Sequence, residues 1–228
     1  MKSILILKNM ACEGPGLIQQ MLNASEIPYE LHEYYLTEGN FDMTNYSAMI
    51  ILGGPMSVND EISLIQKELQ VILEAIRLNL PVLGICLGSQ LISKSLGGEI
   101  TQNPVKEIGI AEIILTSTGK KCYLFQGLPH RFKVFQWHGE TFSIPEDAQL
   151  LATSPICRHQ AFQRDMSWGL QFHFEMTPEI VSKLVLEYAD ELIAEGLEAD
   201  QILRDFKENY PLIKEMGERI FTRFLNFI

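Results

Sequence analysis

Short apolar runs that alternate with helical patterns dominate the first hundred residues, and this alternation constrains the fold more than any other feature of the sequence. The apolar runs cover residues 4–7, 48–52 and 81–85, and residues 29–35 alternate loosely as a further strand. Apolar residues recur at helical spacing between residues 61 and 80, and residues 14–16 open an earlier helix that extends to about Leu22. Strands that alternate with helices predict a parallel sheet covered on both faces. Catalytic groups in such sheets gather at the carboxyl ends of the strands.

The pattern changes after Gly97 and Gly98. Short strand candidates follow, with little helix between them, at residues 107–116, 131–136, 148–153, 157–163 and 169–174. These segments predict an antiparallel or mixed portion of sheet. From Thr177 the chain is helical again, with Thr177 as the N-cap and Pro178 at the first helical position. Two or three helices are expected to complete the chain.

Together these patterns predict one α/β domain that includes all residues 1–228. Its expected core is a doubly wound, mostly parallel sheet with helices on both faces. A small antiparallel or mixed portion extends the sheet, and a helical C-terminal segment begins at about residue 177.

The composition excludes several classes of function. With 29 acidic and 18 basic side chains the formal net charge is −11, which disfavours nucleic acid or an anionic membrane as the main partner. No apolar run reaches the ~18 residues that a membrane span requires. The four cysteines form no Cys-x-x-Cys pair, so neither disulfides nor a zinc site are expected. We expect a cytoplasmic protein with a small-molecule substrate, no cofactor and no metal.

A cysteine stands where a predicted strand gives way to a predicted helix. Residues 84–88 read Gly-Ile-Cys-Leu-Gly, the nucleophile-elbow pattern with Cys86 in the nucleophile position. Glycines are needed on either side because the turn is tight, and the N-terminus of the following helix favours a thiolate and a developing oxyanion. The alternative is a buried cysteine beside a helix cap.

His173 provides a candidate base for this cysteine. It lies near the end of an apolar segment, and Glu175 follows two residues later. In an extended chain residues two apart project to the same side, so Glu175 could orient the imidazole and stabilise its protonated form. The alternative is a core histidine beside a surface glutamate.

A candidate oxyanion hole follows the third predicted strand. Gly53-Gly54-Pro55 carries no side chain that would block backbone amides from a developing negative charge. The N–H of Leu87, directly after the cysteine, is the usual second donor in elbow enzymes. On its own the Gly-Gly-Pro sequence is a weak signal and is more often a plain turn.

These three features resemble the motifs of the class I (triad) glutamine amidotransferases. Residues 51–58, 81–91 and 169–175 are similar in order and spacing to that family's Gly-Gly-Pro, Gly-x-Cys-x-Gly-x-Gln and Gln-Phe-His-Pro-Glu motifs. The resemblance extends from residue 1 to about 190. It is closest to the glutaminase domain of GMP synthetase and its free-standing relatives, because residues 136–140 resemble that group's His-Gly-Asp segment and residues 157–162 its following strand. The implied fold is flavodoxin-like.

The resemblance implies a catalytic triad. Cys86 would attack the side-chain amide of glutamine, His173 would carry the proton to the leaving ammonia, and Glu175 would orient His173. Gly54 and Leu87 would supply the oxyanion amides. The γ-glutamyl thioester that forms would then be hydrolysed by water.

The same resemblance places Gln90 in the glutamine pocket, and His138 and Glu140 near the amino-acid end of the substrate. Two residues depart from the family pattern: Phe174 stands where the family has proline, and Glu140 stands where it has aspartate. Glu140 adds one methylene to any substrate contact that it makes.

Three functions fit these features. The leading expectation is a free-standing hydrolase of the γ-glutamyl amide bond of glutamine or a γ-glutamyl compound, because residues 176–228 form a longer helical segment than expected for a separate glutaminase subunit. The first alternative is such a subunit, supplying ammonia to a separate synthetase chain. The second is a catalytically silent binding protein with the same fold, which the intact residues Cys86, His173 and Glu175 disfavour.

Overall fold

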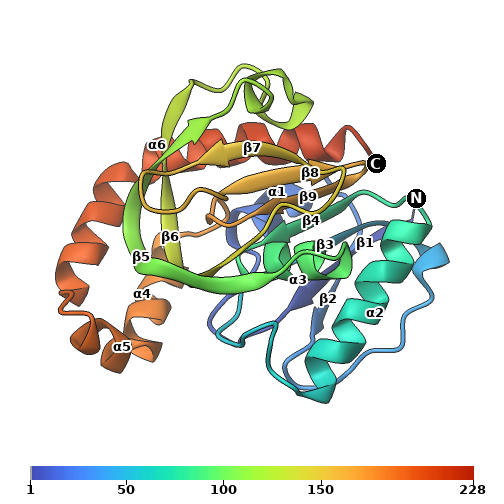
Figure 1. Cartoon of the computed structure of the whole chain (residues 1–228), viewed down its shortest axis with the longest axis horizontal. Coiled ribbons are helices and arrows are strands. Elements are labelled where there is room, and N and C mark those ends of the chain that lie inside the picture. The colour runs from blue at the N-terminus through green and yellow to red at the C-terminus, as the bar shows by residue number, and fades with distance from the viewer. Residues whose placement is uncertain (1) are drawn as a thin grey trace.

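The strands of the protein form one continuous sheet. The computed structural model describes residues 2–228, and within them nine strands pair in the order β2-β1-β3-β4-β9-β8-β7-β5-β6 (Figure 1). The first five strands of this order are parallel: β2 (Tyr29–Glu33), β1 (Ser3–Lys8), β3 (Tyr46–Ile51), β4 (Val82–Ile85) and β9 (Ser167–Leu170). Apolar residues fill both faces of β1, β3 and β4, as expected for parallel strands that helices cover on both sides.

The remaining strands are antiparallel and continue the same sheet. They are β8 (Ala161–Arg164), β7 (Gln149–Thr153), β5 (Ile100–Leu115) and β6 (Arg131–Phe142). The predicted α/β class, with a parallel sheet and an antiparallel portion, is confirmed. The antiparallel portion is larger than expected, because β5 and β6 extend well past the predicted segments 107–116 and 131–136.

Helices lie on both faces of the parallel strands, as predicted. On one face lie α1 (Gly16–Ala24) and α6 (Ala199–Leu225), and on the other lie α2 (Ser63–Arg77) and α3 (Leu87–Ser95). Alternation along β1 separates the two cores: Ile4 and Ile6 pack on the α1–α6 side, and Leu5 and Leu7 on the α2–α3 side. Shorter 3-10 helices are η1 (Met43–Asn45), η2 (Gly119–Lys121) and η3 (Tyr123–Phe125).

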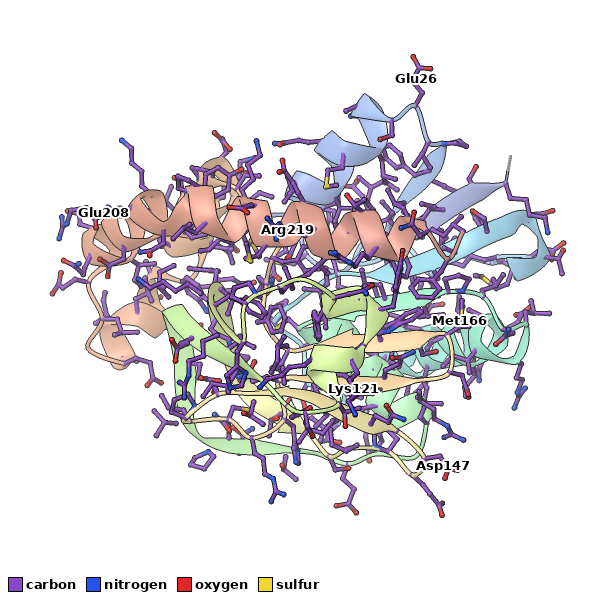
Figure 2. All side chains as sticks on the ribbon, turned by 90° about the horizontal axis from the view of Figure 1, so that it is seen from above. Glu26, Lys121, Asp147, Met166, Glu208 and Arg219 are labelled. Atoms are coloured by element: carbon purple, nitrogen blue, oxygen red, sulfur yellow. The ribbon has the colours of Figure 1, made fainter. Side chains whose placement is uncertain are left out.

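Three helices follow Thr177 in the described part of the chain. The Thr177 side chain accepts a hydrogen bond from the Ile180 N–H at 3.4 Å, and Pro178 opens α4 (Pro178–Glu187), so the predicted cap is confirmed. Next come α5 (Ala189–Ala194) and the long α6. The α4–α5 segment lies at the end of the molecule formed by β5 and β6 (Figure 1), and Figure 2 shows α6 extending along one side, with Glu208 and Arg219 on it. No helix within residues 2–228 is long and apolar enough to cross a membrane.

Two predicted strands are wrong in their extent. The candidate at 157–163 forms a strand only as β8, from Ala161 onward, because Ser154 and Cys157 close a turn in which the Cys157 N–H donates to Ser154 Oγ at 2.9 Å. The candidate at 169–174 ends as a strand at Leu170. Beyond it, His173 makes only an isolated antiparallel bridge, to Phe135 of β6.

Candidate active site

Cys86 occupies a sharp turn between β4 and α3. Its backbone has φ of 51° and ψ of −111°, a positive φ that non-glycine residues seldom adopt. Both flanking glycines allow close backbone approach. A Cβ at Gly84 would overlap the backbone of Gly88, and a Cβ at Gly88 would overlap the carbonyl of Ile51. The sequence 84–88 therefore folds into a strained strand-to-helix turn that presents the cysteine at the carboxyl edge of the sheet.

The Cys86 side chain lies at the wall of a cavity of about 390 Å³. Only 6% of the residue is exposed. Its thiol is 3.6 Å from the Trp137 carbonyl, to which it donates, and the Gln171 side-chain amide donates to the sulfur at 3.8 Å. The cavity gives a small molecule access to an otherwise buried thiol.

His173 and Glu175 form a tightly held buried pair. Their Nδ1 and Oε1 atoms are 2.6 Å apart, and each residue is 1% exposed. The backbone of His173 is fixed by two hydrogen bonds with Phe135, of 2.9 and 3.3 Å. The second carboxylate oxygen of Glu175 accepts the Phe174 N–H at 3.0 Å, a bond that a proline at position 174 could not make.

The surroundings of His173 favour its protonated form. Burial by itself lowers the pKa of His173, but the negative charge of Glu175, hydrogen bonds with Cys86 and Glu175, and the charge of a Cys86 thiolate raise it well above its ordinary value. The same cavity is lined by Cys86 and His173. An imidazolium at this position can stabilise a neighbouring thiolate and later deliver its proton to a leaving group.

Gly54 and Leu87 lie beside the cysteine. Both line the cavity, and within residues 2–228 neither backbone N–H has a protein acceptor. Leu87 begins α3, whose N-terminus carries positive partial charge. Gly54 does not have a positive φ, and a Cβ there would lie 3.0 Å from side-chain carbons of Asn9 and of Leu87. The two amides are thus available to an oxyanion next to Cys86.

Gln90, His138 and Glu140 form a connected group on the cavity wall. The Glu140 carbonyl accepts the Gln90 side-chain amide at 3.1 Å and lies 2.9 Å from His138 Nδ1. Ser57 Oγ and Gln102 Nε2 donate to Glu140 Oε1 at 3.0 and 2.9 Å. The structure therefore brings Gln90, expected in the glutamine pocket, together with His138 and Glu140, expected near the amino-acid end of the substrate.

Glu107, His138 and Cys157 could in principle bind a metal, since one ligand atom of each lies within 4.8 Å of the others. The Glu107 carboxylate, however, accepts hydrogen bonds from Ser154 Oγ at 2.7 Å and Gln160 Nε2 at 2.6 Å, and it lies 2.9 Å from His138 Nε2. Burial raises the pKa of the Cys157 thiol, which disfavours the thiolate that a metal needs. The donor set fits a hydrogen-bonded network that fixes His138 better than it fits a metal site.

Sequence reasoning missed several residues of the cavity wall, and two of these form a hydrogen-bonded pair. Glu13, which follows β1, and Tyr188, at the end of α4, both line the cavity, and the Tyr188 hydroxyl donates to Glu13 Oε1 at 3.1 Å. In the sequence, residues 14–16 indicate only the start of a helix. An acidic residue that follows the first predicted strand could have indicated Glu13, because functional groups in such sheets lie at the carboxyl ends of the strands.

The sequence of this chain is similar to those of proteins of one family. The model of class-I glutamine amidotransferases matches residues 16–188. The glutamine amidotransferase-like protein YfeJ of Salmonella typhimurium is 32% identical over 189 residues, which is 79% of this chain and 77% of that protein. The glutamine-hydrolysing GMP synthase of Bacillus subtilis is 35% identical over 163 residues, so this chain matches 30% of its length.

Solved structures agree with this relationship over the whole described fold. A glutamine amidotransferase of Thermotoga maritima superposes with a TM-score of 0.90 at 27% identity and covers 98% of both chains. A glutamine amidotransferase of Methylobacillus flagellatus superposes with a TM-score of 0.91 at 28% identity, covering 100% of this chain and 96% of that one. The chain belongs to the class-I glutamine amidotransferase family.

Proposed function

We propose that the protein hydrolyses γ-glutamyl amide bonds through a cysteine thioester. The observation that carries this proposal is the strained turn at Cys86, with a positive φ, placed on a cavity that His173 also lines. The hydrogen bond of 2.6 Å between His173 and Glu175 supports the assignment of base and orienting carboxylate. A merely structural cysteine would not need this backbone conformation.

The chemistry proceeds in two steps. The Cys86 thiolate attacks the γ-carbonyl carbon, and the N–H groups of Gly54 and Leu87 stabilise the oxyanion. The C–N bond then breaks while protonated His173 gives its proton to the leaving nitrogen, which leaves a γ-glutamyl thioester on Cys86. In the second step His173 takes a proton from water, the hydroxide attacks the thioester, and glutamate and the Cys86 thiolate are released.

The wall of the cavity favours a γ-glutamyl compound with a substituted leaving group over free glutamine. Gln90, His138 and Glu140 provide polar contacts for the amino-acid portion of the substrate. Leu184 and Tyr188 bring apolar surface from α4 to the same cavity. Ammonia, the leaving group of glutamine, has no apolar part that could pack against this surface, whereas a substituted amine or an amino acid does.

The alternative is a glutaminase that supplies ammonia to a separate synthetase chain. Its support is the similarity to the amidotransferase portion of GMP synthases, which are up to 35% identical over 70% of this chain. This alternative predicts little hydrolysis by the isolated protein and a rise in glutamine hydrolysis when a synthetase partner is added.

The test is an assay of purified protein for glutamate release from glutamine and from γ-glutamyl dipeptides. We expect release from the dipeptides without any partner, and none from Cys86→Ala. Hydrolysis of neither substrate by a folded preparation would contradict the proposal. Hydrolysis of glutamine alone, at a rate that a partner increases, would favour the glutaminase alternative.

A further inference from the structure

Glu13 is a buried acidic side chain with no role in the proposed mechanism. It is 6% exposed, lies after the carboxyl end of β1, and lines the cavity that contains Cys86 and His173. Burial raises the pKa of the Glu13 carboxyl, although the positive charge of His173 and the Tyr188 hydrogen bond oppose this. Burying an acidic group costs free energy of folding, so we expect the buried Glu13 to have a function.

The two oxygens of Glu13 have different surroundings. Oε1 accepts the Tyr188 hydroxyl at 3.1 Å, whereas Oε2 has no hydrogen-bond partner within residues 2–228. Oε2 lies so close to Gly53 that a Cβ on Gly53 would overlap it. The position of that hypothetical Cβ is 3.1 Å from His173 Cε1 and 3.5 Å from Cys86 Cβ. The free oxygen therefore lies next to the candidate nucleophile and base.

We propose that the free oxygen of Glu13 accepts a hydrogen bond from the leaving nitrogen of the scissile amide. This assignment rests on the proposed hydrolysis of γ-glutamyl amides, and it adds Glu13 to the residues that contact the substrate. Tyr188 is a positioning residue, since it holds the other oxygen of the carboxyl group. Gly53 is required by the same geometry, because any side chain there would displace Glu13.

The position of His173 explains why the leaving nitrogen is the partner. Nδ1 of His173 is occupied by Glu175, so the proton for the leaving group comes from Nε2. Cε1 joins the two ring nitrogens, and because Nδ1 is held by Glu175, Nε2 is the nitrogen left to face the cavity that Glu13 also lines. A nitrogen held at Nε2 is thus in the same cavity as Glu13 Oε2. An amide N–H is a donor, and the donor strengthens as the nitrogen gains the proton from His173 and becomes positively charged.

A pair of substrates that differ in one atom tests this contact. The γ-methylamide of glutamate carries an N–H at the scissile bond, and the γ-methyl ester carries an oxygen there. Both release glutamate, which is measured for wild type, Glu13→Met and Glu13→Gln. Methionine matches the volume of glutamate without an acceptor oxygen, and glutamine keeps one oxygen. Glu187→Gln removes a charge from the exposed surface next to Tyr188 and is the matched control.

We expect Glu13→Met to lower kcat/KM for the methylamide by about 10- to 100-fold, which is the change in rate that corresponds to losing a hydrogen bond to a charged group. Its kcat/KM for the methyl ester should not fall. Glu13→Gln should lie between wild type and Glu13→Met on the amide, and Glu187→Gln should match wild type on both substrates. Thermal unfolding confirms that each variant is folded, and Tyr188→Phe gives a second, milder test in which only the amide rate falls.

The results distinguish a failure of this inference from a failure of the proposed function. An equal fall on amide and ester would overturn the leaving-nitrogen contact, because Glu13 would then act on the site in general. Unchanged amide hydrolysis in Glu13→Met would overturn it as well. Wild-type protein that releases glutamate from neither compound would overturn the proposed function, and this inference with it.

Discussion

His173 and Glu175 are expected to contribute unequally to catalysis. His173→Ala removes the group that transfers the proton and should lower kcat by about 10²- to 10⁴-fold. Glu175→Gln keeps an oxygen that accepts from Nδ1, so it should retain more activity than His173→Ala. Initial rates of glutamate release, at saturating substrate, compare the two variants. Wild-type turnover by His173→Ala would mean that the base is elsewhere, with His138 as the next residue to test.

Gly54 can be tested separately from the stability of its turn. Its φ is not positive, so alanine introduces no backbone strain, and the new Cβ would press only on side-chain carbons of Asn9 and Leu87 at 3.0 Å. If the Gly54 amide stabilises the oxyanion, displacing it affects the transition state, and Gly54→Ala should lower kcat by about 10²- to 10³-fold. The melting temperature should change little. A variant with normal kcat would leave Gly53-Gly54-Pro55 as a structural turn.

The sequence predicted the contact between His173 and Glu175 better than it predicted the backbone that carries them. The i, i+2 spacing placed Glu175 beside His173 correctly, yet the strand that was expected to hold them ends at Leu170. His173 is fixed instead by its bridge to Phe135. Such a bridge joins segments far apart in the chain, and local apolar pattern cannot predict it. Glu13 and Tyr188, 175 residues apart, escaped the sequence analysis for the same reason.

The connection between β9 and α4 gives a prediction about Phe174. Its side chain is 1% exposed, and its N–H donates to Glu175. Phe174→Leu should lower the free energy of unfolding by about 1 kcal/mol or more while keeping kcat, because the N–H remains. Phe174→Pro, which removes the N–H, should be less stable still and should also lower kcat. Chemical denaturation and steady-state rates measure both. Equal kcat in the two variants would show that this N–H does not support Glu175.

At the scale of the sheet, the parallel half was predictable and the antiparallel half only partly so. Short apolar runs with helices between them define parallel strands locally. The boundary between β8 and β9 depends on a tight turn at Asp165, which has φ of 50°, and neither glycine nor proline marks it. The order β9-β8-β7-β5-β6 also depends on pairings between distant segments. Local pattern indicates that these strands exist but not how they pair.

The stability of the whole molecule should depend on the protonation of Glu68. This α2 residue is fully buried, Asn9 Nδ2 donates to its Oε1 at 3.0 Å, and burial raises its pKa from about 4.5 to about 8. Between these values the folded protein retains a proton that the unfolded chain has lost. The contribution of Glu68 to stability is therefore complete below about pH 4.5 and is lost as the pH rises through about 8.

Glu68→Gln tests this linkage, because glutamine mimics the neutral acid and still accepts from Asn9. The melting temperature of wild type, relative to this variant, should fall between pH 5 and pH 8. Glu74→Gln, an exposed change on the same helix, is the control and should show no such trend. A constant difference between wild type and Glu68→Gln across this range would contradict the assignment.

The whole molecule brings the ends of four parallel strands to one cavity. Glu13 follows β1, Gly54 follows β3, Cys86 follows β4 and His173 follows β9, so strands from across the sheet supply the site. The central claim, that Cys86 is the nucleophile, depends on this convergence.

The most direct test of that claim is to map where an electrophilic glutamine analogue attaches. Intact mass followed by peptide mapping should find one label, on Cys86, with Cys12, Cys122 and Cys157 unmodified. Cys86→Ala should take up no label and hydrolyse no γ-glutamyl substrate, while its melting temperature stays near that of wild type. A label found mainly on another cysteine, or hydrolysis by Cys86→Ala, would contradict the account.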